Sequence, residues 1–547
     1  MPDTHGRTRI LVVDDERLIR LTLSAKLKTL GYIPVAVGTV DEAVAVLQEQ
    51  HGGFRAILTD IMMGTMDGFK FRSIVRDIDP SMPIFFLTAL DPEEGSGFLK
   101  KILEDPISYY LPKSTDTDVL LKRVQNIVAS RRIEQFIERQ MANQRKALSL
   151  AAQVQRSMLP LRTILTPRGM YTTLWKPNDI VSGDLYEAIP FGFGCYLYVL
   201  GDIQGHGTSA ALAMTAVQSF LKQLAHREGM PLMEPHDIAN LLQKFFRDNL
   251  VDVSYMTALI CIHRPLSGDV VWLSCGAPDI IVIDPEDPNC KPVNPEHRGG
   301  VPIGLFPDTE YTAGDVVTTP LSRTAVCVCF TDGIFDLARD KEGIEKLPEE
   351  TLRQTCKELV CEGRSRCALI PVPYKLMSAL SALGYKENPD DATILMFGAR
   401  LFLDGVFQAA VPLNPASVDD VAQSLGEWCE ARGWDVDLVA RVQLVLEEKL
   451  MNIHDHGFDD RERLHEAVGV RVELVRDNVE MTIWDCGTQE PSIEVAAGSS
   501  DIAFELVNRK FSGRGRGRLM VREICNGIER SSYAGMNETV YYVPVTR

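Results

Sequence analysis

The sequence predicts a multidomain protein of α/β and α+β modules, because the hydrophobic pattern changes twice along its 547 residues. Residues 1–125 alternate short apolar runs with amphipathic helices, the pattern of an α/β domain with a doubly wound parallel sheet. Residues 161–400 combine strand–turn–strand runs with helices, which indicates an α+β domain with antiparallel β sheets in a sandwich. Residues 401–547 form a second α+β unit, and residues 126–160 read as a helical linker.

The composition narrows the class of protein and of partner. The net charge of −18 and the pI of about 5.1 argue against nucleic acid or an anionic membrane as a main partner. The twelve cysteines are scattered without a C-x-x-C pair, which fits reduced thiols in a cytoplasmic protein. No apolar run approaches the roughly 18 residues of a membrane span, so we expect none.

The first module carries acidic residues where predicted strands end. Asp14 and Asp15 follow the run "RILVV", and Asp60 ends "AILTD". The carboxyl ends of parallel strands meet in one crevice, and three carboxylates gathered there call for a cation such as Mg²⁺. Thr88 ends the next strand and Lys113 follows the last one, so a hydroxyl and an ammonium face an anion at Asp60.

These five residues in this order resemble the receiver domain of bacterial response regulators, over about 120 residues. The resemblance implies that Asp60 accepts a phosphoryl group from a sensor histidine kinase. It also implies roles for five other residues: Mg²⁺ binding by Asp14 and Asp15, phosphate pairing by Lys113, phosphate sensing by Thr88 and an aromatic switch at Tyr110. The usual Lys-Pro pair is replaced by Lys113-Ser114, which is a departure from that family.

The linker is expected to be one long helix, because residues 114–159 contain neither glycine nor proline. Apolar residues recur there at a coiled-coil-like spacing: Ile133, Ile137, Met141, Leu148 and Ala152. We expect this helix to connect the domains and to form a homodimer. The alternative is a single amphipathic helix that packs on a neighbouring domain.

The central module places aspartates at the edges of predicted strands in four segments, "IVSGDLYE", "YVLGDIQGHG", "VCVCFTDGIFD" and "NPDDATILMFG". Buried carboxylates brought together repel one another unless cations lie between them. Oxygen ligands without histidine or cysteine indicate Mg²⁺ or Mn²⁺, and two such ions can activate water for attack on a phosphate ester. The glycines allow close backbone approach, so the carbonyl after Asp202 can complete the ligand shell.

The four segments resemble the PP2C-type serine/threonine phosphatases, in their bacterial stress-response and sporulation branch. The resemblance implies two Mn²⁺ or Mg²⁺ ions held by Asp184, Asp202, the Ile203 carbonyl, Asp332 and Asp390, with Asp391 as the rival of Asp390. The segment "AAQVQRSMLP" resembles the helix that regulates activity in that branch. Ser182, Leu185 and Glu187 depart from the branch's usual residues. His206, between two glycines, is either a proton donor to the leaving group or an ordinary loop residue.

The last module contains three boxes that suit a nucleotide. Glu448 and Asn452 lie four residues apart on one helical face, so they can supply a base and a ligand for phosphate-bound Mg²⁺. Asp485 ends a strand before Gly487, where a carboxylate can accept from an adenine amino group. A glycine-rich loop before a helix can surround phosphates, and it contains Gly513, Gly515 and Gly517.

In this order the boxes resemble the GHKL ATP-binding fold of the anti-sigma-factor serine kinases. The alternative is a degenerate module that binds a protein and no ATP. A hybrid histidine kinase is disfavoured because the helix over residues 114–159 contains no histidine.

The order of the three modules resembles that of the HsbR-type regulators of partner switching. It implies that phosphorylation of Asp60 changes the dimer, that the helix transmits the change, and that the phosphatase acts on a phosphorylated anti-sigma-factor antagonist. The last module is then the opposing serine kinase, or a site for a sigma factor. Two alternatives remain: a non-catalytic last module that only binds a partner, and a phosphatase for unrelated phosphoproteins.

Overall fold

The structure is a computed structural model that forms two compact units, Met1–Arg145 and Lys146–Arg547. Each unit is described by itself. The residues described are 8–49, 53–63, 66–88, 102, 104–192, 194–205, 207–225, 233–250, 255–287, 299–366, 368–387, 390–458, 466–487 and 516–546.

The first unit contains the predicted doubly wound α/β fold. Its five strands are parallel in the order β2-β1-β3-β6-β7. The strands are β1 (Arg9–Val13), β2 (Ile33–Val37), β3 (Phe54–Asp60), β6 (Ile84–Thr88) and β7 (Ser108–Pro112), and a two-stranded ribbon joins β4 (Met62–Met63) to β5 (Met66–Asp67). The helices are α1 (Arg17–Thr29), α2 (Val40–Glu49) and α3 (Gly68–Ile78). Helices α2 and α3 cover one sheet face, and α1 covers the other.

The predicted long helix is confirmed as α5 (Thr117–Met158), which has 42 residues. Its first turns belong to the first unit, because Leu120, Leu121 and Val124 are buried against α1. The boundary predicted between residues 125 and 126 therefore falls inside a continuous helix. Farther along, Phe136 and Met141 are 62% and 57% exposed, so an apolar stripe on α5 is uncovered in this chain.

The central module is a pair of antiparallel five-stranded sheets, as predicted. Their orders are β10-β11-β12-β13-β15 and β14-β16-β17-β9-β8. The strands are β8 (Thr163–Leu165), β9 (Gly169–Lys176), β10 (Asp184–Pro190), β11 (Tyr196–Ile203), β12 (Met256–Arg264), β13 (Asp269–Cys275), β14 (Ile281–Ile283), β15 (Val317–Pro320), β16 (Val326–Phe330) and β17 (Ala392–Ala399).

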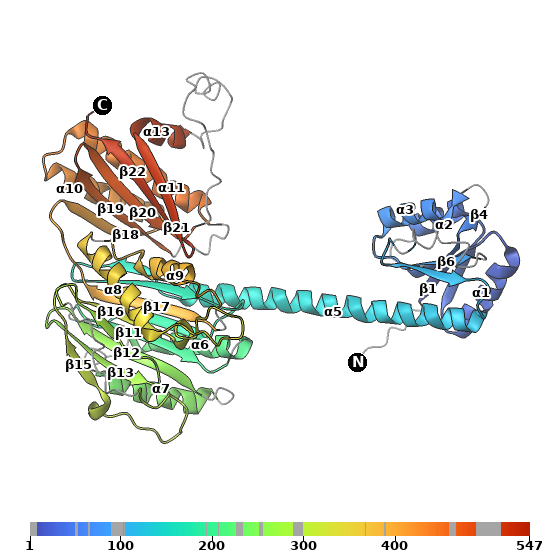
Figure 1. Cartoon of the computed structure of the whole chain (residues 1–547), viewed down its shortest axis with the longest axis horizontal. Coiled ribbons are helices and arrows are strands. Elements are labelled where there is room, and N and C mark those ends of the chain that lie inside the picture. Colours follow the sequence, from blue (N-terminus) through green and yellow to red (C-terminus); the bar gives the residue numbers. More distant parts are fainter. Residues whose placement is uncertain are drawn as a thin grey trace. The chain divides into compact units, whose positions relative to one another are not determined.

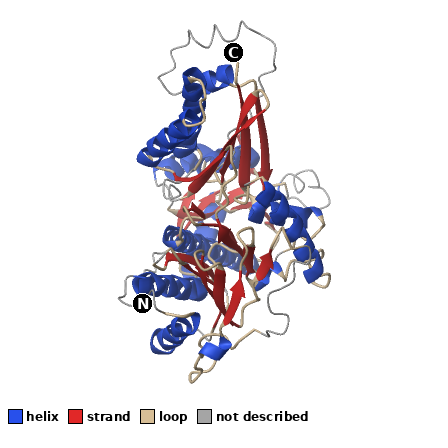
Figure 2. Ribbon diagram, turned by 90° about the vertical axis from the view of Figure 1, so that its left-hand side faces the viewer, coloured by secondary structure: helices blue, strands red, loops and turns tan. Residues whose placement is uncertain are grey.

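Helices cover both outer faces of this sandwich (Figures 1 and 2). Helices α6 (Thr208–Ala225) and α7 (Pro235–Asn249) pack on the first sheet, and α8 (Glu349–Ser365) and α9 (Val372–Ala382) pack on the second. The layer between the sheets is rich in aromatic residues, with Tyr198 stacked on Phe397 at 4.2 Å between ring centres. Short 3₁₀ turns complete the module: η2 (Ala313–Asp315) and η3 (Asp332–Ile334).

The C-terminal module has one antiparallel sheet in the order β18-β19-β20-β22-β21. Its strands are β18 (Val406–Pro412), β19 (Ala467–Val475), β20 (Asn478–Asp485), β21 (Gly527–Tyr533) and β22 (Met536–Pro544). Helices α10 (Pro415–Glu430), α11 (Val436–His456) and α13 (Arg516–Ile524) lie on one face of it (Figure 1).

One local prediction is wrong by a residue. The sequence "VRDNVE" predicts a hairpin between β19 and β20 that turns at Asp477-Asn478, but Asn478 already pairs with Val475. The turn is therefore Arg476-Asp477, with Arg476 at a φ of +54°. A left-handed conformation is unusual for arginine, so the residue type does not predict a turn at this position.

None of the described helices is both long enough and apolar enough to cross a membrane.

Candidate functional site

The first unit gathers three carboxylates at the carboxyl ends of β1 and β3. Ligand oxygens of Asp14, Asp15 and Asp60 lie within 4.8 Å of one another. Asp14 is fully buried and Asp60 nearly so, whereas Asp15 is exposed. The chain holds this loop through Arg20, whose guanidinium donates to the backbone carbonyls of Asp14 and Asp15 at 2.7 and 2.9 Å. The geometry fits one divalent cation held by oxygens.

Lys113 connects two of these carboxylates. Its ammonium lies 2.6 Å from Asp60 Oδ2 and 3.0 Å from Asp14 Oδ2. Burial raises the pKa of Asp14, against the lowering effect of Lys113. Burial also acts to lower the pKa of Lys113, but hydrogen bonds to Asp60 and Asp14 outweigh it, so the pKa of Lys113 is raised. Lys113 thus stays charged and placed to pair with an anion attached to Asp60.

The other two residues predicted for this site lie on the neighbouring strands. Thr88 ends β6 and pairs with Pro112 on β7, although its side chain lies outside the described part of the chain. Tyr110 lies two residues earlier on β7 and is half-buried beside the core that α2 and α3 cover.

The second unit brings the predicted aspartates of the central module to one end of the sandwich. Asp184 begins β10 and pairs directly with Asp202 on β11 in the first sheet. Asp332 follows β16 and begins η3, and Asp390 and Asp391 precede β17, so these three come from the second sheet.

Asp184 connects the two sheets and has one oxygen without a partner. Its Oδ2 accepts hydrogen bonds from Thr331 at 2.8 Å and from Thr393 at 2.6 Å. Its Oδ1 is buried and makes no hydrogen bond in the described structure. A buried carboxylate oxygen without a donor is costly, and a divalent cation would remove that cost. Burial raises the pKa of Asp184 well above its usual value, and Asp391 and Asp332 raise it further.

The carboxylates around Asp184 also repel one another, which raises their pKa values. Burial raises the pKa of Asp202 to about 9, with further contributions from Asp184, Asp332 and Asp390. Burial also raises the pKa of Asp332, with Asp390 next in importance. Without a cation this end of the sandwich therefore holds protons at neutral pH, so a metal ion has to displace them.

The backbone between Asp184 and Asp202 is close enough for a carbonyl ligand. A Cβ placed on Gly183 would lie 3.0 Å from the Ile203 carbonyl and 3.3 Å from Asp202 Oδ1. Only a glycine leaves this space open, as expected where a carbonyl must face an ion. Among the described residues, only the set in the first unit brings three ligand oxygens within 4.8 Å.

Asp390, which the sequence analysis preferred as a metal ligand, and its rival Asp391 have different surroundings in the structure. Asp391 accepts from the backbone N–H groups of Asn178 and Gly183, both at 2.7 Å, and it is buried. Asp390 is exposed, and its Oδ1 accepts from the N–H of Asp391 at 2.8 Å. The geometry favours Asp390 as the ligand, whereas Asp391 holds the backbone that precedes Asp184. His206 lies outside the described residues.

The C-terminal module places its predicted nucleotide residues around the end of β20. Glu448 and Asn452 are half-buried on α11, one helical turn apart. Gly487 lies directly against the backbone of Gly457 at the end of α11, where a Cβ would clash. Asp485, at the end of β20, is buried. This close contact brings the strand end that carries Asp485 to the end of α11.

Asn537 is a member of this group that the sequence did not reveal. Its side-chain amide donates to Asp485 Oδ1 at 3.1 Å and to the Gly487 carbonyl at 2.9 Å. It therefore fixes the carboxylate that we expect to face adenine. Gly513 and Gly515 lie outside the described residues, and Gly517 is part of α13 rather than of the loop before it.

Three family models match successive parts of the chain. They are the response regulator receiver domain over residues 10–125, stage II sporulation protein E (SpoIIE) over residues 193–400, and the histidine kinase-like ATPase domain over residues 411–540. The chain therefore contains a receiver domain, a SpoIIE-type domain and a histidine kinase-like ATPase domain in succession. We refer below to its receiver, SpoIIE-type and ATPase domains.

Curated relatives match single parts of the chain. A probable transcriptional regulator ycf27 of Cyanophora paradoxa is 32% identical over 125 residues, which are 22% of this chain and 51% of the relative. Phosphoserine phosphatase RsbP of Bacillus subtilis (strain 168) is 22% identical over 194 residues, which are 36% of this chain and 46% of RsbP. The chain thus spans about half or less of the length of the relatives it matches.

Solved structures resemble larger parts of the chain. The RsbU and RsbW domains of Rv1364c from Mycobacterium tuberculosis are 16% identical, with 70% of this chain and 96% of that chain covered and a TM-score of 0.38. The SiaA-PP2C domain of Pseudomonas aeruginosa is 20% identical, with 48% and 98% covered and a TM-score of 0.37.

The end of α5 touches the acidic end of the SpoIIE-type domain through Gln155, which lies in the segment "AAQVQRSMLP" noted in the sequence but was not singled out within it. Gln155 is 1% exposed, and its amide donates to the Ser182 carbonyl at 2.8 Å and accepts from the Ser182 N–H at 3.2 Å. Ser182 immediately precedes Gly183 and Asp184. One signal was available: Leu148, Ala152 and Gln155 follow a helical spacing, so a polar residue takes a place where an apolar one is expected.

Proposed function

We propose that this protein is a metal-dependent serine/threonine phosphatase controlled by phosphorylation of its receiver domain. The observation that carries the proposal is the buried, unpartnered Oδ1 of Asp184 beside Asp202, at the end of the sandwich that also holds Asp332 and Asp390. That arrangement is stable at neutral pH only with cations or bound protons.

The residues at this site are proposed to have two roles, cation binding and positioning of the ligands. Asp184, Asp202 and the Ile203 carbonyl would hold cations from the first sheet, and Asp332 and Asp390 from the second. Two Mn²⁺ or Mg²⁺ ions bound there would supply an activated water and neutralise the charge of a phosphate ester. The hydroxyls of Thr331 and Thr393 keep Asp184 in its orientation, and Asp391 holds the backbone N–H of Gly183.

The proposed substrate is a phosphoserine or phosphothreonine on a small anti-sigma-factor antagonist. The chain's order of domains and the likeness to RsbP support this choice. The alternative, an unrelated phosphoprotein, is decided by assaying candidate antagonists from the same cell.

The proposed input is a phosphoryl group on Asp60, received from a sensor histidine kinase in the cytoplasm. Mg²⁺ held by Asp14 and Asp15 would accompany the transfer, and Lys113 would pair with the phosphoryl oxygens. Helix α5 would carry the signal, since it packs in the receiver core at Leu121 and contacts Ser182 at Gln155. Its exposed apolar stripe supports a homodimer as the element that phosphorylation changes.

The ATPase domain is proposed to bind Mg²⁺·ATP and to phosphorylate the same antagonist. In this reading Glu448 acts as base, Asn452 holds the metal, and Asp485 accepts from adenine. The second candidate is a non-catalytic domain that only binds a sigma factor or the antagonist. Wild-type protein that binds the antagonist but transfers no phosphate from ATP would establish the second candidate.

The phosphatase proposal is tested with Asp202→Ala and Asp332→Ala in the full chain. Both variants should lose Mn²⁺-dependent release of phosphate from the phosphorylated antagonist by at least about a hundredfold, because each removes a metal ligand. Asp308→Ala is the matched control, since Asp308 is an exposed acid of the same domain. Wild-type rates in Asp202→Ala and Asp332→Ala would contradict the assigned site.

A further inference from the structure

The SpoIIE-type domain and the ATPase domain share a hydrophobic core. Trp484 and Met536 of the ATPase sheet belong to the same buried cluster as Ile370 and Tyr374 of the phosphatase. A Cβ on Gly469 in β19 would lie 2.8 Å from the side chain of Ile370, so the two backbones approach closely there. Contacts of this kind resemble the interior of one domain more than a loose contact between two.

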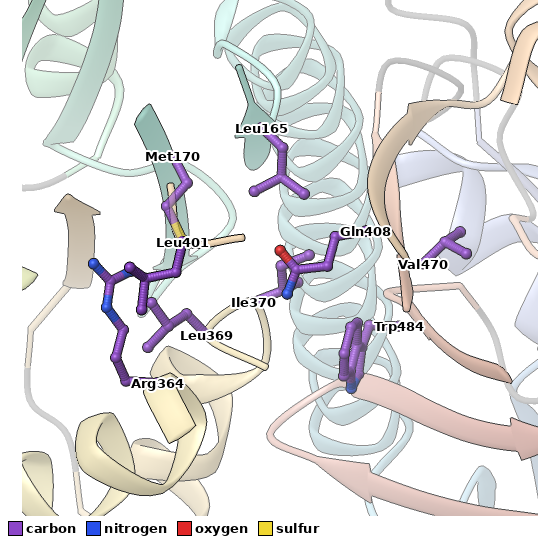
Figure 3. Close-up of a pocket in the computed structure, with 9 residues that line it drawn as sticks. All are labelled: Leu165, Met170, Arg364, Leu369, Ile370, Leu401, Gln408, Val470 and Trp484. Atoms are coloured by element: carbon purple, nitrogen blue, oxygen red, sulfur yellow. The ribbon is translucent and has the colours of Figure 1, made fainter. Parts of the chain in front are cut away.

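One cavity within this contact, between Ile370 and Trp484, is too small for a ligand. Figure 3 shows Trp484, Gln408 and Val470 of the ATPase domain facing Ile370 and Leu165 of the phosphatase. Its volume is about 10 Å³, which is room for at most one water. At this point the contact is a packed joint that can transmit displacement, whereas larger cavities of about 550 and 250 Å³ lie elsewhere between the two domains.

The joint lies on one face of β20, and Asp485, the residue proposed to bind adenine, lies on the opposite face. Side chains alternate along a strand, so Trp484 and Cys486 point away from the side that Asp485 occupies. Trp484 packs in the shared core, and the Cys486 thiol donates to the Tyr374 hydroxyl at 3.5 Å. A displacement of Asp485 therefore moves two residues that touch the phosphatase.

A polar network leads from this strand end to the end of α5. The guanidinium of Arg162 donates to the Tyr374 hydroxyl at 3.2 Å and pairs with Glu466 at 3.2 Å, just before β19. The Tyr374 hydroxyl in turn donates to the Thr173 carbonyl on β9 at 3.1 Å. Arg162 lies four residues after the last residue of α5, Met158. The ATPase sheet is thus tied to the segment that leaves the helix.

The same segment is fixed to both phosphatase sheets. The carbonyls of Pro160 and Leu161 accept from Tyr186 at 2.9 Å and from Tyr171 at 2.7 Å. One and a half turns earlier in the helix, Gln155 holds the backbone of Ser182, two residues before Asp184. Continuous contacts therefore join the adenine-side carboxylate to the proposed metal ligands.

We propose that the nucleotide site has a second function, as an allosteric effector site for the phosphatase. An adenine nucleotide at Asp485 changes the position of Cys486 and Trp484, and the joint through Tyr374 and Arg162 passes this change to the α5 end and to Asp184. The inference rests on the proposed nucleotide site and phosphatase, and it requires no phosphoryl transfer by the ATPase domain. Coupling between two binding sites is reciprocal. If the nucleotide changes the affinity for metal by some factor, bound metal changes the affinity for the nucleotide by the same factor.

The test uses the full chain, Mg²⁺·ADP as the nucleotide and p-nitrophenyl phosphate as the phosphatase substrate. ADP cannot rephosphorylate a substrate, so any effect on the rate is allosteric. At constant free Mn²⁺, saturating ADP should change kcat/KM by about fivefold or more, the range typical of allosteric coupling. Calorimetric titrations of ADP with and without Mn²⁺, and of Mn²⁺ with and without ADP, should show each ligand changing the affinity for the other by one and the same factor.

Two variants cut the joint without touching either site. Tyr374→Phe removes the hydroxyl that Arg162 and Cys486 contact, and Glu466→Gln removes the charge that pairs with Arg162. Both should bind ADP and hydrolyse substrate, with the effect of ADP reduced below twofold. Tyr311→Phe is the matched control, because its buried hydroxyl donates to the Val301 carbonyl at 2.9 Å and contacts Cys275, both inside the phosphatase. It should keep the full effect of ADP.

The outcomes separate this inference from the proposed function. Absence of ADP binding in the wild-type chain overturns the nucleotide site and, with it, this inference. Binding of ADP without a change in phosphatase rate overturns the inference alone. It is overturned as well if Tyr374→Phe and Glu466→Gln respond to ADP like the wild type, or if Tyr311→Phe loses the response equally.

Discussion

Thr393→Val is the substitution that most directly tests whether Asp184 is a metal ligand. Thr393 is fully buried on β17, and its hydroxyl donates to Asp184 Oδ2 at 2.6 Å. Valine has nearly the same shape, so the sandwich keeps its packing and loses one donor. Thr331 still donates to the same oxygen, and it still accepts the backbone N–H of residue 393.

The magnitude follows from the charge on the acceptor. A hydrogen bond to a charged group contributes about 1.5–3 kcal/mol, which is a factor of about 10 to 150 in an equilibrium constant. The carboxylate is charged when a cation is bound, whereas burial keeps it protonated without one. The metal-free protein loses about 1 kcal/mol of stability, the usual contribution of a neutral hydrogen bond. The difference of about 0.5–2 kcal/mol should lower Mn²⁺ affinity near pH 7 by a factor of about 2 to 30.

Two assays read this difference. Calorimetric titration gives the Mn²⁺ affinity, and phosphatase rates over a range of Mn²⁺ concentrations show whether saturating metal restores turnover, as we expect. Thr173→Val is the matched control, because Thr173 is equally buried on the adjacent strand and donates to the Ile394 carbonyl at 2.9 Å. Equal Mn²⁺ affinities for Thr393→Val, Thr173→Val and the wild type would refute the role of Asp184.

Three further predictions address regulation, protonation and nucleotide binding. Gln155→Leu removes the hydrogen bonds to Ser182. Beryllofluoride mimics a phosphoryl group on Asp60, and it should change the phosphatase rate of the wild type but not of this variant. An equal response in both proteins would contradict signalling through α5. The pKa of Asp202 rises from 3.8 to about 9 on folding, so the metal-free protein should lose stability as the pH rises between these values. Because Mn²⁺ displaces the proton, the increase in Tm that Mn²⁺ causes should grow from pH 6 to pH 9. An increase in Tm that stays constant with pH would exclude proton release on binding. Asn452→Ala should abolish Mg²⁺-dependent ATP binding measured by titration, and unchanged affinity would remove Asn452 from the site.

The sequence predicted the fold well because the fold depends on local patterns, and the same patterns led to the acidic residues proposed as ligands. Each strand of the receiver is an apolar run, and Asp14, Asp60, Asp184 and Asp202 each lie where such a run meets a loop or glycine. Residues at strand ends come together at one edge of the sheet, independently of the conformation of the loops. The prediction needed no knowledge of distant contacts.

The sequence was insufficient where a role depends on contacts between distant residues. Asp390 and Asp391 precede the same strand, and they differ only because Asp391 reaches N–H groups 213 and 208 residues away. Gln155 and Asn537 act on residues 27 and 52 positions away. The turn at Arg476 was misplaced because its positive φ goes against the residue's usual preference.

Repulsion between carboxylates is offset differently in the two acidic clusters of this chain. The difference explains why metal affinity in the phosphatase cluster is suited to control by small backbone displacements. In the receiver, Lys113 supplies a permanent positive charge within 3.0 Å of two carboxylates, so the cluster tolerates the absence of metal. In the phosphatase, the described residues place no basic side chain within ion-pair distance of Asp184 or Asp202, whose pKa values are raised accordingly. Metal binding there competes with protons, so a small displacement of the Ser182–Asp184 backbone alters affinity strongly. Gln155 holds that backbone from the end of α5, where a signal from the receiver and a signal from the ATPase domain would meet.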